Sequence, residues 1–382
     1  MTWLLFCLGG LFLCLSSHPF TTYPFSLWAI RRWRRSISPA LSAISRDQTV
    51  ALCFCAYNEE RVIRDKIQNC LELRQVIPGL EVLAYVDAAT DRTAELLRVH
   101  DTDFTLRISS QRCGKTHGMN LLATLTQASI LVFTDANVMV DREALSNLQR
   151  YFADPGVGCV CGHLTYVNPD ATATAAIGSL YWRLEEWIKQ LETDTGSAMG
   201  ADGSLFAIRR ALRWPVPDHL IDDMFVSLSA LCDGFRVIRA GDVKAYEAAA
   251  TSSRDEFWRK VRISCQGLNV HRVLWPRLRR LDGLTLYKYL SHKFLRWISA
   301  YNLALGIAFL ELALLVVGLP WVAFAAALLI AGILQLGRVR RGRWPSQLWD
   351  IVGALVGSAL GVWYSLRGVD FQVWTPAQSV RE

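Results

Sequence analysis

Uninterrupted apolar runs lie at both ends of the chain. The first thirty residues contain no Asp, Glu, Lys or Arg, and the basic cluster at 31–35, RRWRR, follows directly. In a cleaved secretory signal the positive charge precedes the apolar run, whereas here it comes after it. Residues 1–30 are therefore predicted to be a retained membrane anchor, with the basic cluster in the cytoplasm by the positive-inside rule.

A second apolar region lies near the C-terminus. Its three segments are 298–318, 321–337 and 351–366. The first holds 21 residues with a single charge, Glu311, and is long enough to cross roughly 30 Å of hydrocarbon. The arginine-rich stretch at 338–343 is expected on the cytoplasmic side. Four crossings would put the tail, 367–382, outside, but the shorter segments can instead lie in the membrane interface.

Between these ends, residues 47–250 alternate between strand-like and helix-like patterns. Strands are predicted at 49–55, 81–86, 104–108 and 129–134, and helices at 59–73, 91–99 and 116–127. Such alternation predicts an α/β fold, with a mostly parallel sheet covered by helices on both faces. Ligands of such sheets bind at the carboxyl ends of the strands.

Composition agrees with a soluble domain joined to membrane segments. The 382 residues are 52% hydrophobic and 20% charged, too apolar for an ordinary soluble enzyme. The net charge of +7 gathers near the apolar ends, which favours contact with anionic lipid over nucleic acid. The ten cysteines show no zinc-ligand spacing, so free thiols in a reducing compartment are expected.

The stretch 131–137, LVFTDAN, carries the clearest chemical signal. Asp135 and Asn137 are two positions apart at the end of an apolar strand, so they face the same way and offer two oxygen ligands to one hard divalent cation. A simple Asp-containing turn is the other interpretation.

Further polar residues follow the other predicted strands. Tyr57 and Glu59 follow the first, Asp87 ends the second, and Lys115 precedes the third helix. Each alone is typical of a helix cap or a turn. Together at one sheet edge they supply carboxylates for a base or ribose, a lysine for phosphate and a cation site.

The order of these motifs resembles the family 2 glycosyltransferases, and most closely their membrane-bound branch, which includes cellulose, chitin, hyaluronan and poly-N-acetylglucosamine synthases. The motifs are AYNEE at 56–60, VDAATD at 86–91, GK at 114–115, TDAN at 134–137 and IDD at 221–223. The likeness covers about residues 47–300. It implies a GT-A fold, a nucleotide-sugar donor, Mg²⁺ or Mn²⁺, and inversion at the anomeric carbon.

The resemblance also implies roles. It assigns the nucleoside to Tyr57, Glu59 and Asp87, the diphosphate to Lys115, the metal to Asp135 and Asn137, the acceptor loop to Asp202 and Gly203, and the catalytic base to Asp223 beside Asp222. A carboxylate base suits an inverting displacement because an acceptor hydroxyl is a poor nucleophile. Asn137 departs from the family's second acid and is a weaker, neutral ligand.

The clearest difference from the family's motifs lies at residues 259–263. Processive members carry Gln-x-x-Arg-Trp near here, whereas this chain has Arg259 and Ile263 at the ends of the motif. Arg262 can still meet a departing diphosphate. Residues 251–297 are also predicted to form amphipathic helices on lipid headgroups.

The sequence therefore predicts a multi-pass protein of the cytoplasmic (inner) membrane whose cytoplasmic domain transfers a sugar, most simply from a UDP-sugar. The acceptor would be a carbohydrate or a lipid-linked molecule in cell-surface polysaccharide synthesis, with export or assembly proteins as further partners. The alternative is an inert membrane scaffold that binds nucleotide on the same fold.

Overall fold

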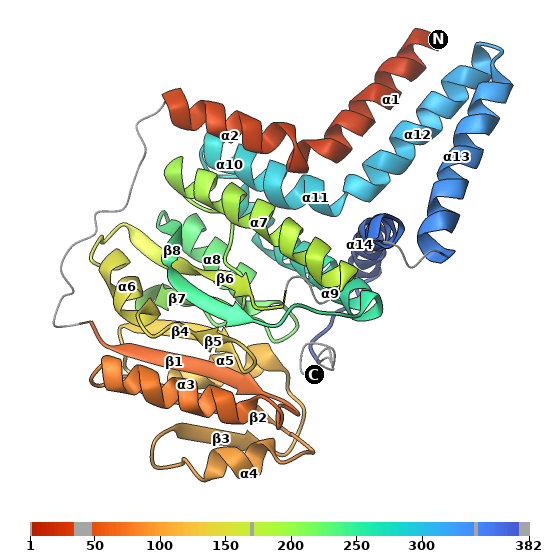
Figure 1. The fold of residues 1–382 in the computed structure, drawn as a ribbon. Helices are drawn as coiled ribbons and strands as arrows, with labels where there is room; N and C mark the ends of the chain where they lie inside the picture. The colour runs from red at the N-terminus through yellow and green to blue at the C-terminus, as the bar shows by residue number, and fades with distance from the viewer. Residues whose placement is uncertain (1, 34–47, 169–171, 340–342, 374–382) are drawn as a thin grey trace.

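The structure is a computed structural model that describes residues 2–33, 48–168, 172–339 and 343–373 (Figure 1). An eight-stranded sheet organises its centre, in the order β3-β2-β1-β4-β7-β6-β8-β5. The strands are β1 Val50–Ala56, β2 Glu81–Asp87, β3 Thr105–Ser109, β4 Ile130–Asp135, β5 Met139–Val140, β6 Val157–Tyr166, β7 Leu205–Arg209 and β8 Arg236–Glu247. The sheet is thus mixed rather than parallel throughout.

The first half of the sheet has the predicted pattern. β3, β2, β1 and β4 are parallel, and helices α3 Ile63–Val76, α4 Thr93–Arg98 and α5 Lys115–Thr124 connect them. Leu52 and Phe54 enter one buried cluster while Ala51 and Cys53 enter another, as expected for a strand covered on both faces. The α/β prediction is confirmed for this half.

The second half is largely antiparallel. β7 is antiparallel to both β4 and β6, β6 is parallel to β8, and the short β5 pairs antiparallel with the end of β8. Helices α6 Ala144–Tyr151 and α8 Asp222–Cys232 and the 3₁₀ turn η2 Arg210–Leu212 complete this half.

One predicted helix begins later than expected. The pattern predicted a helix from residue 59, but α3 starts at Ile63. The carbonyl of Glu59 accepts hydrogen bonds from the amides of Val62 and Ile63, and the amide of Glu59 donates to Thr93 Oγ1 at 2.8 Å. Residues 59–62 are therefore a turn bound to the neighbouring connection, which keeps Glu59 at the sheet edge.

A layer of helices separates the sheet from the apolar helices. The layer holds α7 Ala173–Asp194, α9 Ser253–Leu278, α10 Gly283–Tyr289, the π-turn η3 Leu290–Phe294 and α11 Leu295–Trp297. Beyond it lie α1 Thr2–Ser17, η1 His18–Phe20, α2 Thr22–Trp33, α12 Ser299–Val316 and α13 Pro320–Val339 (Figure 1). α14 Arg343–Leu366 packs against α9.

The first and twelfth helices lie side by side (Figure 1). A Cβ on Gly9 would come within 2.7 Å of Leu310, and one on Gly306 within 2.8 Å of Leu13. Phe12 stacks on Phe309 at 5.6 Å between ring centroids. Small residues at such contacts let two helix backbones approach closely.

Three stretches in the described chain are long and apolar enough to cross a membrane: Thr2–Phe20, Ser299–Val316 and Gln347–Leu366. In Figure 1, α14 is seen nearly end-on while α1 and α12 run across the view, so the third stretch does not run parallel to the other two. Gly361 permits the close contact between α14 and α9, because a Cβ at this position would lie 2.3 Å from the carbonyl oxygen of Val261.

A buried ionic cluster joins the anchor to the helical layer. His292 on η3 is fully buried, and its Nδ1 and Nε2 lie 2.7 and 2.9 Å from Glu192 and Glu185 of α7. Tyr23 of α2 donates to Glu192 at 2.5 Å. The other oxygen of Glu192 accepts from the amide of Met199 at 2.9 Å, so the cluster also holds the loop that leads to residues 200–203.

Candidate active site

A cavity of about 300 Å³ opens at the carboxyl ends of β1, β2 and β4, with side chains from α7 and α9 on its opposite wall. Its lining includes Tyr57, Glu59, Asp87, Lys115, Asp135, Asn137, Asp202, Gly203, Asp222, Asp223, Arg259 and Arg262. The structure thus gathers in one cavity every residue that the sequence singled out, as expected for strand ends at one sheet edge. The role of each remains a prediction.

Asp87 is bound by the loop that leads to Lys115. One carboxylate oxygen accepts from the amide of Cys113 at 2.8 Å, and the other accepts from the amide of Gly114 at 3.0 Å and from Arg112 Nε at 3.1 Å. The guanidinium of Arg112 in turn lies over the ring of Tyr57, 3.3 Å from its centroid. Asp87 therefore fixes the loop that carries Arg112 over Tyr57 on this side of the cavity.

Two residues near these strand ends have positive φ without being glycine. Asn58 has φ of 53° and Ala88 has φ of 52°. The side-chain oxygen Oδ1 of Asn58 accepts from the backbone amide of Thr90 at 2.8 Å, which offsets part of the strain, whereas the side chain of Ala88 has no polar atom to do so. Such strained positions gather at functional sites.

Lys115 lies at the centre of the acidic side chains. Its Nζ is 2.5 Å from Asp135 Oδ1. A Cβ on Gly203 would lie 3.1 Å from both Lys115 Nζ and Asp223 Oδ2, so these two groups occupy opposite sides of a space that only a glycine leaves open. Burial lowers the pKa of Lys115, but Asp135, Asp222 and Asp223 outweigh burial and hold that pKa above its ordinary value.

Asp223 has the protonation behaviour that a general base needs. Burial, followed by the neighbouring charge of Asp222, raises the pKa of Asp223 to about 7, while Lys115 and the amide of Met224 oppose the rise. The Met224 amide donates to Asp223 Oδ1 at 2.6 Å, which leaves Oδ2 beside Gly203. A carboxyl group that titrates near neutrality can take a proton at physiological pH.

Asp222 contributes a buried oxygen with no partner. Asp222 begins α8 and is only 4% exposed, and its Oδ2 has no hydrogen-bond partner within the described chain. A buried carboxylate oxygen left without a donor is costly unless a ligand or solvent satisfies it.

The predicted metal ligands, Asp135 and Asn137, lie beside a second acidic group, Glu247. Asn137 Nδ2 donates to Glu247 Oε1 at 2.8 Å, at the end of β8. In the described residues no group of three or more His, Cys, Asp or Glu side chains converges as a metal cage. Mg²⁺ commonly binds one or two carboxylates together with substrate phosphates and water, so the oxygen donors of Asp135 and Asn137 fit a cation shared with a diphosphate.

Arg259 and Arg262, the two arginines of the 259–263 stretch, differ in their surroundings. Arg259 forms hydrogen bonds of 2.8 and 3.1 Å to Glu256, one turn earlier on α9, and Glu256 raises the pKa of Arg259 well above its ordinary value. Arg262 also lines the cavity. Arg259 is therefore part of a helix-borne ion pair at the cavity wall.

Sequence reasoning did not single out Tyr166, Trp182 or Glu247 of the cavity wall. Arg112 was noted within the RCGK stretch before α5 but was given no role of its own. Glu247 is 110 residues from its partner Asn137 and Trp182 lies on a helix of the membrane-side layer. No local pattern marks these two, because tertiary packing alone brings them to the cavity.

Residues 52–215 match the family model described as Glycosyl transferase family 2. This stretch, which is less than half of the chain, is similar to glycosyl transferase family 2. It comprises β1 through β7 and therefore includes the cavity residues from Tyr57 to Ser204, while Asp222, Asp223 and α9 lie beyond it.

Curated relatives are similar over the same domain. A beta-monoglucosyldiacylglycerol synthase from Nostoc sp. is 28% identical over 166 residues, which cover 42% of this chain and 36% of that protein. The O-antigen chain rhamnosyltransferase RfbN of Salmonella typhimurium is 24% identical over 155 residues, covering 38% and 49%. The chain thus matches only about a third to a half of the length of these relatives.

A solved structure resembles nearly the whole chain. The mannosyltransferase PcManGT from Pyrobaculum calidifontis, in complex with GDP-Man and Mn²⁺, superposes with a TM-score of 0.70 at 23% identity. The match covers 94% of this chain and 99% of that one. The two proteins share a fold, including the predicted GT-A-like α/β sheet.

Proposed function

We propose that this protein is a metal-dependent inverting glycosyltransferase that moves a sugar from a nucleotide donor to a hydroxyl acceptor at a membrane. The observation that carries the proposal is the position of Lys115, whose Nζ pairs with Asp135 and lies, with Asp223, beside Gly203. The reaction requires a cationic group for the leaving diphosphate, a carboxylate for its metal ion and a base for the acceptor hydroxyl, and Asp223 titrates near neutrality.

Each group has a defined part in the reaction. The acceptor oxygen forms a bond to the anomeric carbon of the donor while Asp223 takes the hydroxyl proton. The bond between that carbon and the diphosphate oxygen breaks, and the nucleoside diphosphate leaves with its electron pair. Lys115, at the start of α5, faces the charge that develops on the diphosphate.

The charge of the cavity wall supports a divalent cation. Among the described residues the wall holds seven carboxylates and four cationic side chains. A diphosphate would add negative charge to a wall that already has an acidic excess, so Asp135 and Asn137 would hold Mg²⁺ or Mn²⁺ against it. When bound, this ion would neutralise the leaving group.

The position of the cavity supports an acceptor at the membrane. α7 and α9, which supply its far wall, lie in the layer beneath the apolar helices α1 and α12 (Figure 1). The names of the relatives refer to a glucosylated diacylglycerol and to an O-antigen chain, which supports a lipid-linked or carbohydrate acceptor. With the basic clusters inside, the domain would face the cytoplasm at the inner membrane.

The test is turnover of purified full-length protein in lipid nanodiscs. UDP-sugars, and then GDP-mannose, are supplied with Mg²⁺ or Mn²⁺, and release of nucleoside diphosphate is followed. We expect release from one donor class, and at least a roughly 100-fold lower rate for Asp223→Asn. Binding of nucleoside diphosphate without turnover of any donor would instead indicate the inert scaffold.

A further inference from the structure

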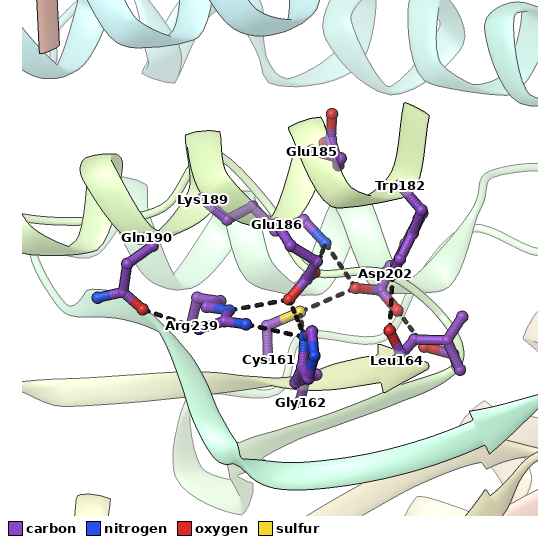
Figure 2. A network of polar contacts seen from close by, with 12 residues as sticks. Cys161, Gly162, Leu164, Trp182, Glu185, Glu186, Lys189, Gln190, Asp202 and Arg239 are labelled. Carbon is purple, nitrogen blue, oxygen red and sulfur yellow. Dashed lines mark hydrogen bonds and ion pairs between the residues drawn. The ribbon is translucent and has the colours of Figure 1, made fainter. Parts of the chain in front are cut away.

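The loop that follows α7 presents Asp202 to the cavity from a buried ionic network. Lys189 Nζ lies 2.7 Å from Asp202 Oδ2 and 3.3 Å from Glu186 Oε1. The side chain of Lys189 is 2% exposed and that of Glu186 is 5% exposed, whereas that of Asp202 is 18% exposed and lines the cavity. Figure 2 shows Lys189 reaching from α7 towards Asp202.

Further contacts fix the network on both sides. Arg239 of β8 donates to Glu186 Oε2 at 2.8 Å and to Gln190 at 2.9 Å, and His163 Nδ1 lies 2.5 Å from the same Glu186 oxygen (Figure 2). Glu186 thereby holds the position of Lys189 without facing the cavity. A buried lysine held between two carboxylates has one geometry rather than many.

The hydrogen bonds of Asp202 leave capacity for a ligand. Oδ1 accepts from the hydroxyl of Ser204, and Oδ2 accepts from Lys189 and from the thiol of Cys161 at 3.0 Å. An ionised carboxylate offers about four acceptor positions, so roughly one remains for a group in the cavity. Because this position is an acceptor on a carboxylate that pairs with Lys189, the group that fills it must be a hydrogen-bond donor.

An aromatic wall stands next to this carboxylate. Trp182 lines the cavity, its indole N–H donates to the Leu164 carbonyl at 3.0 Å, and Lys189 Nζ lies 4.7 Å from the indole ring centroid. Tyr166 meets the indole edge-on at 6.0 Å. The orientation of the indole is therefore fixed by the same network that fixes Asp202 (Figure 2).

We propose that Trp182 and Asp202, positioned by Lys189, form an acceptor subsite for a sugar ring, an inference that rests on the proposed glycosyltransferase function. A sugar ring has an apolar face of C–H bonds, which suits the indole, and a rim of hydroxyl groups, which donate to Asp202. Gly203 follows Asp202 and lies beside Asp223 Oδ2, so a hydroxyl of that ring comes next to the base.

Other acceptors fit this wall less well. A diacylglycerol has a single hydroxyl, which is the group that would react. Its acyl chains would then lie against the carboxylate of Asp202 and leave the remaining acceptor position of that carboxylate without a hydrogen bond. A phosphate group brings like charge against Asp202 and Asp223. The acceptor is therefore already glycosylated, as a glycolipid or an oligosaccharide on a lipid.

The first arm of the test compares acceptors. Protein in nanodiscs free of glycoside detergent receives the active donor with octyl β-glucoside, octyl α-mannoside, or 1,2-dioctanoylglycerol. We expect at least one glycoside to stimulate release of nucleoside diphosphate above hydrolysis of the donor by water, and dioctanoylglycerol not to. Stimulation by dioctanoylglycerol equal to that by the glycosides would overturn the subsite but leave the glycosyltransferase function intact.

The second arm separates acceptor from donor. Lys189→Met and Asp202→Asn should raise the glycoside KM roughly tenfold or more while the donor KM changes by less than about twofold, and Lys189→Arg should recover most of the loss. Lys244→Met and Trp187→Ala, exposed positions outside the cavity, are the matched controls. Equal changes in both KM values would assign Lys189 a merely structural role. If Lys189→Met does not fold, Trp182→Leu with the same readouts decides.

Discussion

Nζ of Lys115 and Oδ1 of Asp135 lie 2.5 Å apart, although the two residues come from different strand ends and were assigned to different ligands. The pair joins the side of the cavity predicted to bind the diphosphate to the side predicted to bind the metal. Each charge is compensated by the other in a part-buried site. Replacing either residue should therefore affect both predicted functions.

Chelation tests the metal side. Excess EDTA should abolish release of nucleoside diphosphate, and Asp135→Ala should lose nearly all activity while the protein stays folded. Asn137→Asp should keep activity and lower the Mn²⁺ concentration needed for half-maximal rate, since a charged oxygen is a stronger ligand. The measurement is a metal titration of turnover on each variant. Full activity in excess chelator would remove the metal from the mechanism.

The pH dependence of the rate reports on Asp223. Because its pKa is raised to about 7, the carboxylate is protonated at lower pH and cannot accept the hydroxyl proton. The maximal rate should therefore rise with pH through about 7 and level off above it. Asp223→Asn should remove this rise and lower the rate roughly 100-fold. A wild-type profile flat between pH 5.5 and 8 would assign the base elsewhere.

Gly203 should tolerate no side chain. In Gly203→Ala the new Cβ would stand 3.1 Å from both Lys115 Nζ and Asp223 Oδ2 and push them apart. We expect roughly tenfold or greater loss of turnover with little change in thermal stability, since reacting groups must be held closely. Gly178→Ala on α7 is the matched control because its Cβ would meet nothing within 4 Å. A comparable loss of turnover in both variants would mean that the loss does not depend on the space between Lys115 and Asp223.

The ionic cluster around His292 should stabilise the protein above acidic pH. Burial raises the pKa of Glu192, but His292 and the hydrogen bonds from His292 and Tyr23 outweigh burial and hold it below its ordinary value. A lowered carboxyl pKa contributes stability above the unfolded value and loses it as pH falls through the folded value.

Glu192→Gln tests this cluster. It should cost roughly 3 kcal/mol at neutral pH, because it leaves a buried ion pair broken, and this difference should shrink in acid. Thermal unfolding in nanodiscs from pH 7 down to 3 measures it, with the exposed Glu72→Gln as control. An unchanged unfolding temperature at pH 7 would contradict the assignment.

The basic clusters predict the orientation of the protein. With 31–35 and 338–343 in the cytoplasm, cysteines placed near either cluster should react with an impermeant maleimide only in permeabilised cells. The exposed native thiols Cys7 and Cys14 are first replaced by serine. Labelling in intact cells at either position would reverse the orientation.

The sequence predicted those parts of the site that depend on local patterns. Asp135 and Asn137 both line the cavity at the end of a strand, as expected, but β4 ends at Asp135 and Asn137 lies in the turn that follows, so alternation along the strand does not extend to it. The contact of Lys189 with Asp202 could not be predicted, because it depends on how α7 packs over the loop at 200–203. A lysine within an amphipathic helix is normally a solvated residue, and burial against two carboxylates leaves no mark in the sequence.

The antiparallel half of the sheet was likewise beyond local reasoning. β6 and β8 are parallel although they are far apart in the chain, and β7 lies between β4 and β6 in the opposite direction. Strand direction here follows from long-range pairing rather than from any strand's own pattern. The same holds for Glu247, whose position beside Asn137 depends on the end of β8.

The pairing of Gly9 with Gly306 sets an order of events during synthesis. At about 5–20 residues per second, the ribosome makes α1 roughly 15–60 seconds before its partner helix α12 exists. During that interval the glycine face of α1 lacks its partner helix, while the strands β1 to β8 are being made. A chain interrupted between residues 247 and 299 would therefore hold all eight strands of the described sheet and α1, but not the helix that pairs with α1.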